Sequence, residues 1–127
     1  MKVLLDTNAL MIPVQFGIDL FGNLREILGS FEPVTVPGVI MELEGISRGK
    51  GRDSAAARVG LMITEQCTLV GTEARHDLSA DEQIVQYAAD TGSIVVTNDQ
   101  ELRNTLHQRG VDVISMRNRK QMQLLRA

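Results

Sequence analysis

Residues 2–8 read Lys2-Val3-Leu4-Leu5-Asp6-Thr7-Asn8, an apolar run that is cut off by an aspartate. A second run, Ile94-Val95-Val96, is followed three residues later by Asp99. Short apolar runs of this kind predict buried strands. An acid that follows a buried strand lies at the carboxyl edge of an open α/β sheet, which is where such folds place their sites. We therefore expect Asp6 and Asp99 to come together at that edge.

Strand-like runs alternate with helix-like segments along the rest of the chain, which is the pattern of a parallel sheet covered by helices on both faces. Pro37 suits a first helical turn, Asp53 suits an N-cap, and Gly92 and Gly110 suit chain reversals after helices. The sequence thus predicts an α/β fold with a mostly parallel sheet of about five strands. The expected strands are residues 2–6, 34–36, 68–70, 94–97 and 112–115, and the expected helices are about 19–28, 37–47, 53–66, 79–91 and 99–108.

Length and composition favour one globular domain in a reducing compartment. A chain of 127 residues can bury one core but not two. Its 43% apolar content is typical of a soluble protein, and its single cysteine cannot form an intramolecular disulfide. No apolar run approaches the length of a membrane span, and the first run stops too early for a signal peptide. We expect a cytoplasmic protein with no membrane association.

The net charge of −3 hides an uneven distribution. Residues 71–102 carry seven acids and one arginine, whereas residues 103–127 carry six Lys or Arg and one acid. A second basic cluster surrounds Gly49 and Gly51. An acidic pocket with basic flanks suits a polyanion that must meet a metal, although solvated surface charge is an equally good explanation of charge alone. We expect one domain over residues 1–115 and a basic tail over 116–127, either helical or disordered.

Helical geometry separates Glu42 from Glu44. Val39, Leu43 and Ile46 form one apolar stripe at 100° per residue. Glu42 lies about 60–70° from the centre of that stripe, and Glu44 lies about 130° away, toward solvent. Glu42 is therefore the candidate for a cleft, and Glu44 is a surface charge.

Capping chemistry separates Asp81 from Glu82. Ser79-Ala80-Asp81-Glu82 reads as a capping box in which Glu82 reaches back to the Ser79 amide, which leaves Asp81 free for another role. Each candidate acid still has a structural alternative, because Asp6 and Asp99 also suit helix caps and Asp81 suits a first helical turn. The order of the four acids carries more weight than any one of them. Carboxylates about 5 Å apart repel by roughly 3 kcal/mol per pair at an effective dielectric near 20, so the cluster calls for a hard divalent cation.

This order of motifs resembles the PIN-domain nucleases from residue 1 to about residue 115. The matching residues are Asp6-Thr7-Asn8, Val36-Pro37 with Glu42-Leu43, Asp81 with Ile84 and Ala88, and Thr97-Asn98-Asp99 with Leu102. The resemblance implies a three-layer α/β/α sandwich and hydrolysis of single-stranded or structured RNA with Mg²⁺ or Mn²⁺.

The resemblance also implies roles for particular residues. The catalytic candidates are Asp6, Glu42, Asp81 and Asp99, and of these Asp6, Asp81 and Asp99 are expected to bind the metal. The expected polar neighbours of the metal are Thr7, Asn8, Thr97 and Asn98. The candidates for contacts with RNA phosphates are Arg48, Lys50, Arg52, Arg117, Arg119 and Lys120.

Several functions fit this interpretation. A PIN-type endoribonuclease serves either as the toxin of a toxin–antitoxin pair, with a small antitoxin protein as partner, or in ribosomal-RNA processing. A homodimer is expected in either case. A non-catalytic RNA-binding module of the same fold is the alternative, although the complete set of acids counts against it. A phosphorylatable receiver-like domain is disfavoured because none of Lys2, Lys50 and Lys120 follows a late strand.

Overall fold

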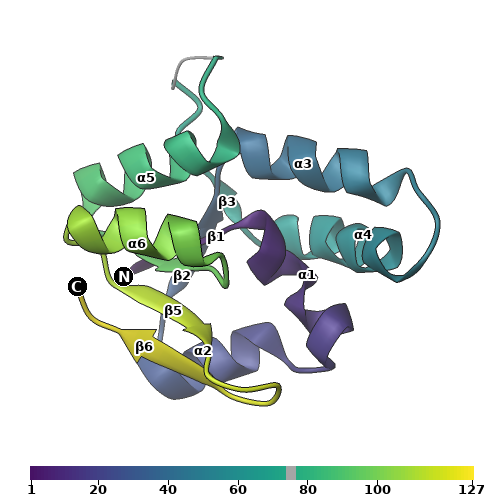
Figure 1. Ribbon diagram of the computed structural model, residues 1–127, viewed down its shortest axis with the longest axis horizontal. Helices are drawn as coiled ribbons and strands as arrows, with labels where there is room; N and C mark the ends of the chain where they lie inside the picture. The colour runs from purple at the N-terminus through teal and green to yellow at the C-terminus, as the bar shows by residue number, and fades with distance from the viewer. Residues whose placement is uncertain (74–76) are drawn as a thin grey trace.

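The computed structural model describes residues 1–73 and 77–127, and over these residues it forms one sheet of six strands with six helices (Figure 1). The elements in chain order are β1 (Lys2–Leu5), α1 (Thr7–Phe16), α2 (Leu20–Leu28), β2 (Glu32–Thr35), α3 (Pro37–Ser47), α4 (Arg52–Thr64), β3 (Thr68–Leu69), α5 (Ala80–Thr91), β4 (Ile94–Val96), α6 (Gln100–Gln108), β5 (Val113–Met116) and β6 (Met122–Leu125). No helix in the described part of the chain combines the length and apolar character needed to cross a bilayer.

The strands follow the order β3-β2-β1-β4-β5-β6, and every neighbouring pair is parallel except β5 with β6. α4 packs against both α1 and α3, and α3 also contacts α5, where the Gly38 amide donates to the Gln83 side-chain oxygen at 2.9 Å. Figure 1 shows α5 and α6 together on one side of the sheet, with α2 on the opposite side. The predicted α/β class and mostly parallel sheet are confirmed.

The sixth strand comes from the segment that was expected to be a helix or a disordered tail. Residues 117–121 form a turn in which the Asn118 carboxamide oxygen accepts hydrogen bonds from the Lys120 and Gln121 amides, at 2.9 and 3.0 Å. β6 then pairs antiparallel with β5, with Met116 opposite Met122. The expectation of a helix or disorder is therefore wrong. Four residues without a β-branched side chain form a strand here because β5 offers them a partner.

Two helix starts also differ from expectation. α1 begins directly after Asp6, in a stretch for which no helix was expected, and Pro13 lies inside it. Proline disfavours a helix interior, so the sequence argued against this element, yet four consecutive residues, 9–12, are buried against the sheet. α4 begins at Arg52 after Gly51, so Asp53 lies in the first turn and is not the N-cap.

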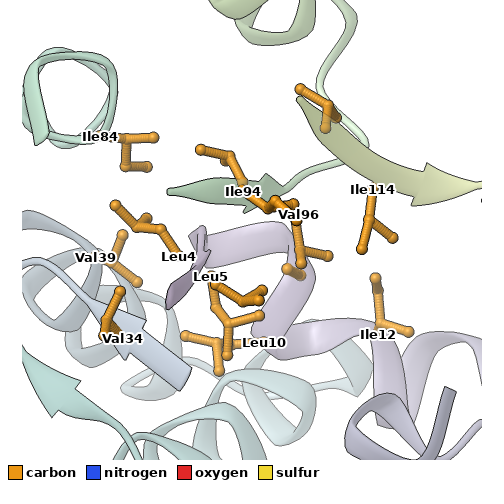
Figure 2. Close-up of a cluster of buried hydrophobic side chains, with 14 of the residues drawn as sticks. Leu4, Leu5, Leu10, Ile12, Val34, Val39, Ile84, Ile94, Val96 and Ile114 are labelled. Carbon is orange, nitrogen blue, oxygen red and sulfur yellow. The ribbon is translucent and has the colours of Figure 1, made fainter. Parts of the chain in front are cut away.

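The core lies on both faces of β1. Leu4 and Leu5 are fully buried, and alternation along the strand points them to opposite faces. Figure 2 shows Leu4 on the side of Ile84 from α5 and Leu5 beside Leu10 from α1. Each such side chain contributes roughly 1.5–3 kcal/mol by leaving water. The central position of β1 in the sheet thus fixes where its carboxyl end lies.

Close packing of α1 on α4 depends on a glycine. A Cβ added at Gly60 would lie 3.0 Å from the Leu10 carbonyl oxygen, whereas one added at Gly45 in α3 meets no atom within 4 Å. Gly45→Ala should stabilise the protein by about 0.5–1 kcal/mol, because alanine loses less backbone entropy in a helix. Gly60→Ala should be about 1–3 kcal/mol less stable than Gly45→Ala, because backbone atoms must move. Urea unfolding of both variants measures the difference, and equal stabilities would contradict the packing of α1 on α4.

Candidate active site

The first acid is placed by strand register. The last residue of β1, Leu5, pairs with the last residue of β4, Val96. The residues that follow the two strands, Asp6 and Thr97, are therefore neighbours at the carboxyl edge of the sheet. The Asp6 amide donates to the Val96 carbonyl at 3.3 Å, and the Asp6 carboxylate accepts from the Ala9 amide at 2.6 Å, which makes it the N-cap of α1. Asp6 is 4% exposed. A short strand and a helix cap together hold this carboxylate at the carboxyl edge of the sheet.

The end of β4 places Asp99 in a similar way. Its amide donates to the Thr97 hydroxyl at 3.0 Å, and its carboxylate accepts from the Leu102 amide at 2.8 Å, so that Asp99 caps α6. Asn98 faces a different neighbour, since its side-chain oxygen accepts from the Met116 amide of β5 at 2.8 Å. Thr97 is fully buried beneath this edge.

The other two acids come from α5 and α3. The expected capping box at Ser79 is present, with the Ser79 amide donating to the Glu82 carboxylate at 3.1 Å, and Asp81 takes no part in it. Glu42 lies on α3, and its carboxylate accepts a hydrogen bond from the Thr7 hydroxyl. This bond joins α3 to the first turn of α1.

These four acids line one cavity of about 510 Å³, together with Thr7 and Asn8. Sequence reasoning missed three further lining residues of α3, Met41, Gly45 and Ile46. Ile46 was expected on the buried stripe but is 36% exposed, because it lies in the last turn of α3 and borders the cavity. Gly45 and Ile46 follow Glu42 by three and four residues, so the helical repeat places them on its face. The spacing of three and four residues from Glu42 is the sequence signal that identifies Gly45 and Ile46 as cavity residues.

Comparison with known families identifies this arrangement. A family model described as a PIN like domain matches residues 3–119. The chain belongs to the PIN-domain family.

Two curated relatives resemble this PIN domain over most of their length. Ribonuclease VapC9 of Archaeoglobus fulgidus is 36% identical over 109 residues, which cover 85% of this chain and 77% of that protein. Ribonuclease VapC4 of Methanocaldococcus jannaschii is 28% identical over 128 residues, which cover 97% and 95%.

Solved structures share the architecture of this PIN domain. The PIN domain endonuclease Utp24 matches with a TM-score of 0.81 at 27% identity, over 99% of this chain and 92% of that one. VapBC2 from Rickettsia felis, solved bound to a promoter DNA fragment, matches with a TM-score of 0.62 at 13% identity, over 91% of this chain and 98% of that one, and shows the shared fold alone.

The carboxylates of this PIN domain perturb one another. Burial raises the pKa of Asp6 to about 7; hydrogen bonds from Thr97 and the Ala9 amide oppose the rise, and the charges of Asp81 and Asp99 add to it. The pKa of Asp81 is also raised, first by burial and then by the nearby charges of Asp99, Glu42 and Glu101. The site therefore concentrates negative charge, and no cationic side chain stands among the described residues that line the cavity.

Three helices of the PIN domain begin at this cavity. Asp6 and Asp99 cap α1 and α6, and α5 begins one residue before Asp81. A helix N-terminus carries partial positive charge and unpaired amides, which suit a phosphate group. The cavity thus combines carboxylates for a cation with helix termini that favour an anion.

The donor set fits a hard divalent cation. Among the described residues that line the cavity there is no Lys, Arg or His, and the acidic groups offer only oxygen ligands, as Mg²⁺ and Mn²⁺ prefer. Within residues 1–73 and 77–127, however, no three His, Cys, Asp or Glu side chains converge closely enough to ligate one ion together. Mg²⁺ commonly uses one or two carboxylates and keeps several waters, so this spacing suits Mg²⁺ better than a fully protein-ligated ion.

The basic candidates lie outside the cavity, in the α3–α4 loop, at the first residue of α4 and in the β5–β6 turn, and two of them contact the far end of α1. The Arg52 guanidinium donates to the Val14 and Gln15 carbonyls, at 3.0 and 3.3 Å. The Arg119 guanidinium lies over the Phe16 ring, 5.7 Å from its centre. Arg48, Lys50, Arg117 and Lys120 are exposed in the same two loops. α1 therefore connects the acidic cavity at its first turn with basic loops at its last turn.

Proposed function

We propose that this PIN domain is an endoribonuclease that depends on Mg²⁺ or Mn²⁺. One observation carries the proposal: four acids from four separate segments line a single cavity without a cationic side chain among its described lining residues. Relatives named as ribonucleases and an endonuclease of similar fold support the same reading. The substrate is RNA and the reaction is hydrolysis of its phosphodiesters.

Asp6, Asp81 and Asp99 would hold the cation at the carboxyl edge of the sheet, one or two of them directly and the remainder through waters of its coordination shell. When bound, it supplies Lewis acidity that activates a water and offsets charge on the phosphate. The Thr97 hydrogen bond favours the ionised form of Asp6, which is the form that can bind a cation. Thr7 holds the Glu42 carboxylate at the cavity wall, where Glu42 orients a water or completes the ligand set. The N-termini of α1, α5 and α6 favour the phosphate at the same place.

RNA backbone contacts are assigned to the two basic loops. Arg48 and Lys50 lie in the α3–α4 loop, and Arg117 and Lys120 lie in the β5–β6 turn. Arg52 and Arg119 are placed by α1, so they position their loops as well as carry charge. An RNA strand that runs along α1 from these basic residues reaches Asp6 and Thr7 at the first turn of the helix.

Two biological uses fit this activity. The matches to the two VapC ribonucleases favour the toxin of a toxin–antitoxin pair, with a small antitoxin protein as partner. The other use is ribosomal-RNA processing, and the match to the Utp24 endonuclease supports an endonuclease in either role. The expected homodimer is tested by sedimentation of the purified chain in either case.

A matched pair of α3 variants tests the proposal. Glu42→Gln should lower the rate of RNA cleavage by about 10- to 100-fold, which is typical of losing a group that supports a metal site. Glu44→Gln should leave the rate unchanged, because Glu44 is exposed and lines neither the cavity nor the core. The assay follows a labelled RNA in Mn²⁺ with both variants purified in parallel. Equal losses, or no cleavage by the unmodified chain, would contradict the proposal.

A further inference from the structure

A groove between α5 and α6 adjoins the acidic cavity. It encloses about 570 Å³, and Asp81 lines both spaces. We call it the α5–α6 groove and define it by six of its lining residues: Asp81, Val85, Gln86, Leu102, Thr105 and Arg109. Because one residue belongs to both spaces, a ligand in the acidic cavity can continue into the groove.

The groove leads away from the acids in one direction. α5 and α6 both begin at the acidic cavity and run the same way from it, as Figure 1 shows. The nine residues of α6 span about 13 Å, and Arg109 follows its last residue. Asp81 therefore marks the near end of the groove and Arg109 the far end.

The chemistry of the groove changes along this path. Val85 is half-buried and offers apolar surface, which suits the face of a base, whereas Leu102 is buried. Gln86 and Thr105 are exposed and offer hydrogen-bonding groups suited to base edges. Arg109 is the only cationic side chain among the described residues that line the groove, and a guanidinium pairs well with a phosphate.

We propose that the α5–α6 groove holds the RNA strand on one side of the cleaved bond, with a base against Val85 and a backbone phosphate at Arg109. The inference rests on the proposed function, since it gives the substrate its exit from the acidic cavity. A strand that enters along α1 and crosses the acids leaves between α5 and α6.

A basic protein segment is the alternative ligand for the groove, because the groove contains acidic side chains. Asp81 and Glu101 at the near end would attract one. The cation at the far end would repel it, and the Glu82 carboxylate already accepts a hydrogen bond from the Ser79 amide. RNA is compatible with the charges at both ends of the groove. A bound divalent ion would offset the acids at the near end, and Arg109 would pair with a phosphate at the far end.

Binding of a fluorescein-labelled single-stranded RNA, followed by anisotropy in Ca²⁺ over a series of salt concentrations, tests the proposal. Thr105→Glu fills the groove from an exposed position with a longer, negatively charged side chain and should weaken binding at least about tenfold, because a like charge against a phosphate is strongly unfavourable. Arg109→Ala should weaken binding and reduce the log–log salt slope by about 0.7. Arg25→Ala removes an exposed charge from α2, across the sheet from the groove, and should leave the binding constant less affected than Arg109→Ala does.

Gln86→Glu repeats the block from α5 should Thr105→Glu not fold, as judged by circular dichroism. Unchanged RNA affinity in a folded blocking variant, with an unchanged slope in Arg109→Ala, would overturn the inference and leave the groove to a protein segment. Cleavage of the same RNA in Mn²⁺ separates the two proposals. If the unmodified chain cleaves while the groove variants bind normally, the groove assignment alone fails. If the unmodified chain neither cleaves nor binds, both fail.

Discussion

Replacing Asp6 with asparagine should lower RNA cleavage by at least about 1,000-fold while leaving the fold intact. Asparagine keeps the size of the side chain and an oxygen that can accept from the Ala9 amide, so the N-cap of α1 is preserved. It removes the charge that the acidic cavity offers to a cation. Labelled RNA in Mn²⁺ measures the rate, and circular dichroism confirms the fold.

Asp19→Asn is the matched control for this substitution. Asp19 caps α2 through the Gly22 amide at 3.0 Å, so the same chemical change is made at a helix cap outside the cavity. The control should cleave at the rate of the unmodified chain. Wild-type cleavage by Asp6→Asn, with contaminating nuclease excluded, would remove Asp6 from the site.

The second large effect concerns stability in the absence of metal. Burial raises the pKa of Asp6 from 3.8 in the unfolded chain to about 7 in the fold, so the folded state prefers the protonated form. The resulting stability is fully present below pH 3.8 and is lost as the pH rises through about 7. The loss is on the order of 4 kcal/mol over the whole range. Chemical unfolding in EDTA between pH 5 and pH 8 measures the part of the loss that falls above pH 5, which is roughly 3 kcal/mol.

Asp6→Asn removes this pH dependence because asparagine does not titrate. At pH 8 in EDTA the variant should therefore be more stable than the unmodified chain, although it has lost activity. Adding Mn²⁺ at pH 8 should raise the melting temperature of the unmodified chain and raise that of the variant much less, because a ligand of the folded state stabilises it by mass action. A melting temperature that does not respond to Mn²⁺ in either protein would mean that the acids do not bind a cation.

The sequence was sufficient where a local rule decides the outcome. The position after a buried strand predicted that Asp6 and Asp99 would meet, and both line one cavity. The capping box predicted that Glu82 would be engaged, and it is. Both rules concern residues a few positions apart or strands paired in a regular sheet, so they need no knowledge of the rest of the fold.

Local rules failed where distant parts of the chain decide the structure. Pro13 argued against α1, yet burial of the residues just before it holds the helix in place. β6 depends on β5 for its partner, and the Arg119 contact with Phe16 joins residues that are far apart in the chain. Ile46 continues the apolar stripe of α3 in sequence, but at the end of that helix it meets an open cavity. Patterns within one element do not contain this information.

Two of the four acids are also helix caps, and this restricts how the site can be lost during evolution. Asp6 and Asp99 each accept a hydrogen bond from a backbone amide in the first turn of a helix. An apolar replacement would therefore remove a helix cap, which is worth about 1 kcal/mol of stability, and would also remove activity. Asparagine, serine and threonine preserve the cap and remove the charge. A descendant that has given up cleavage and kept the fold is therefore expected to carry one of these three residues at positions 6 and 99, so that its sequence still resembles that of an active enzyme.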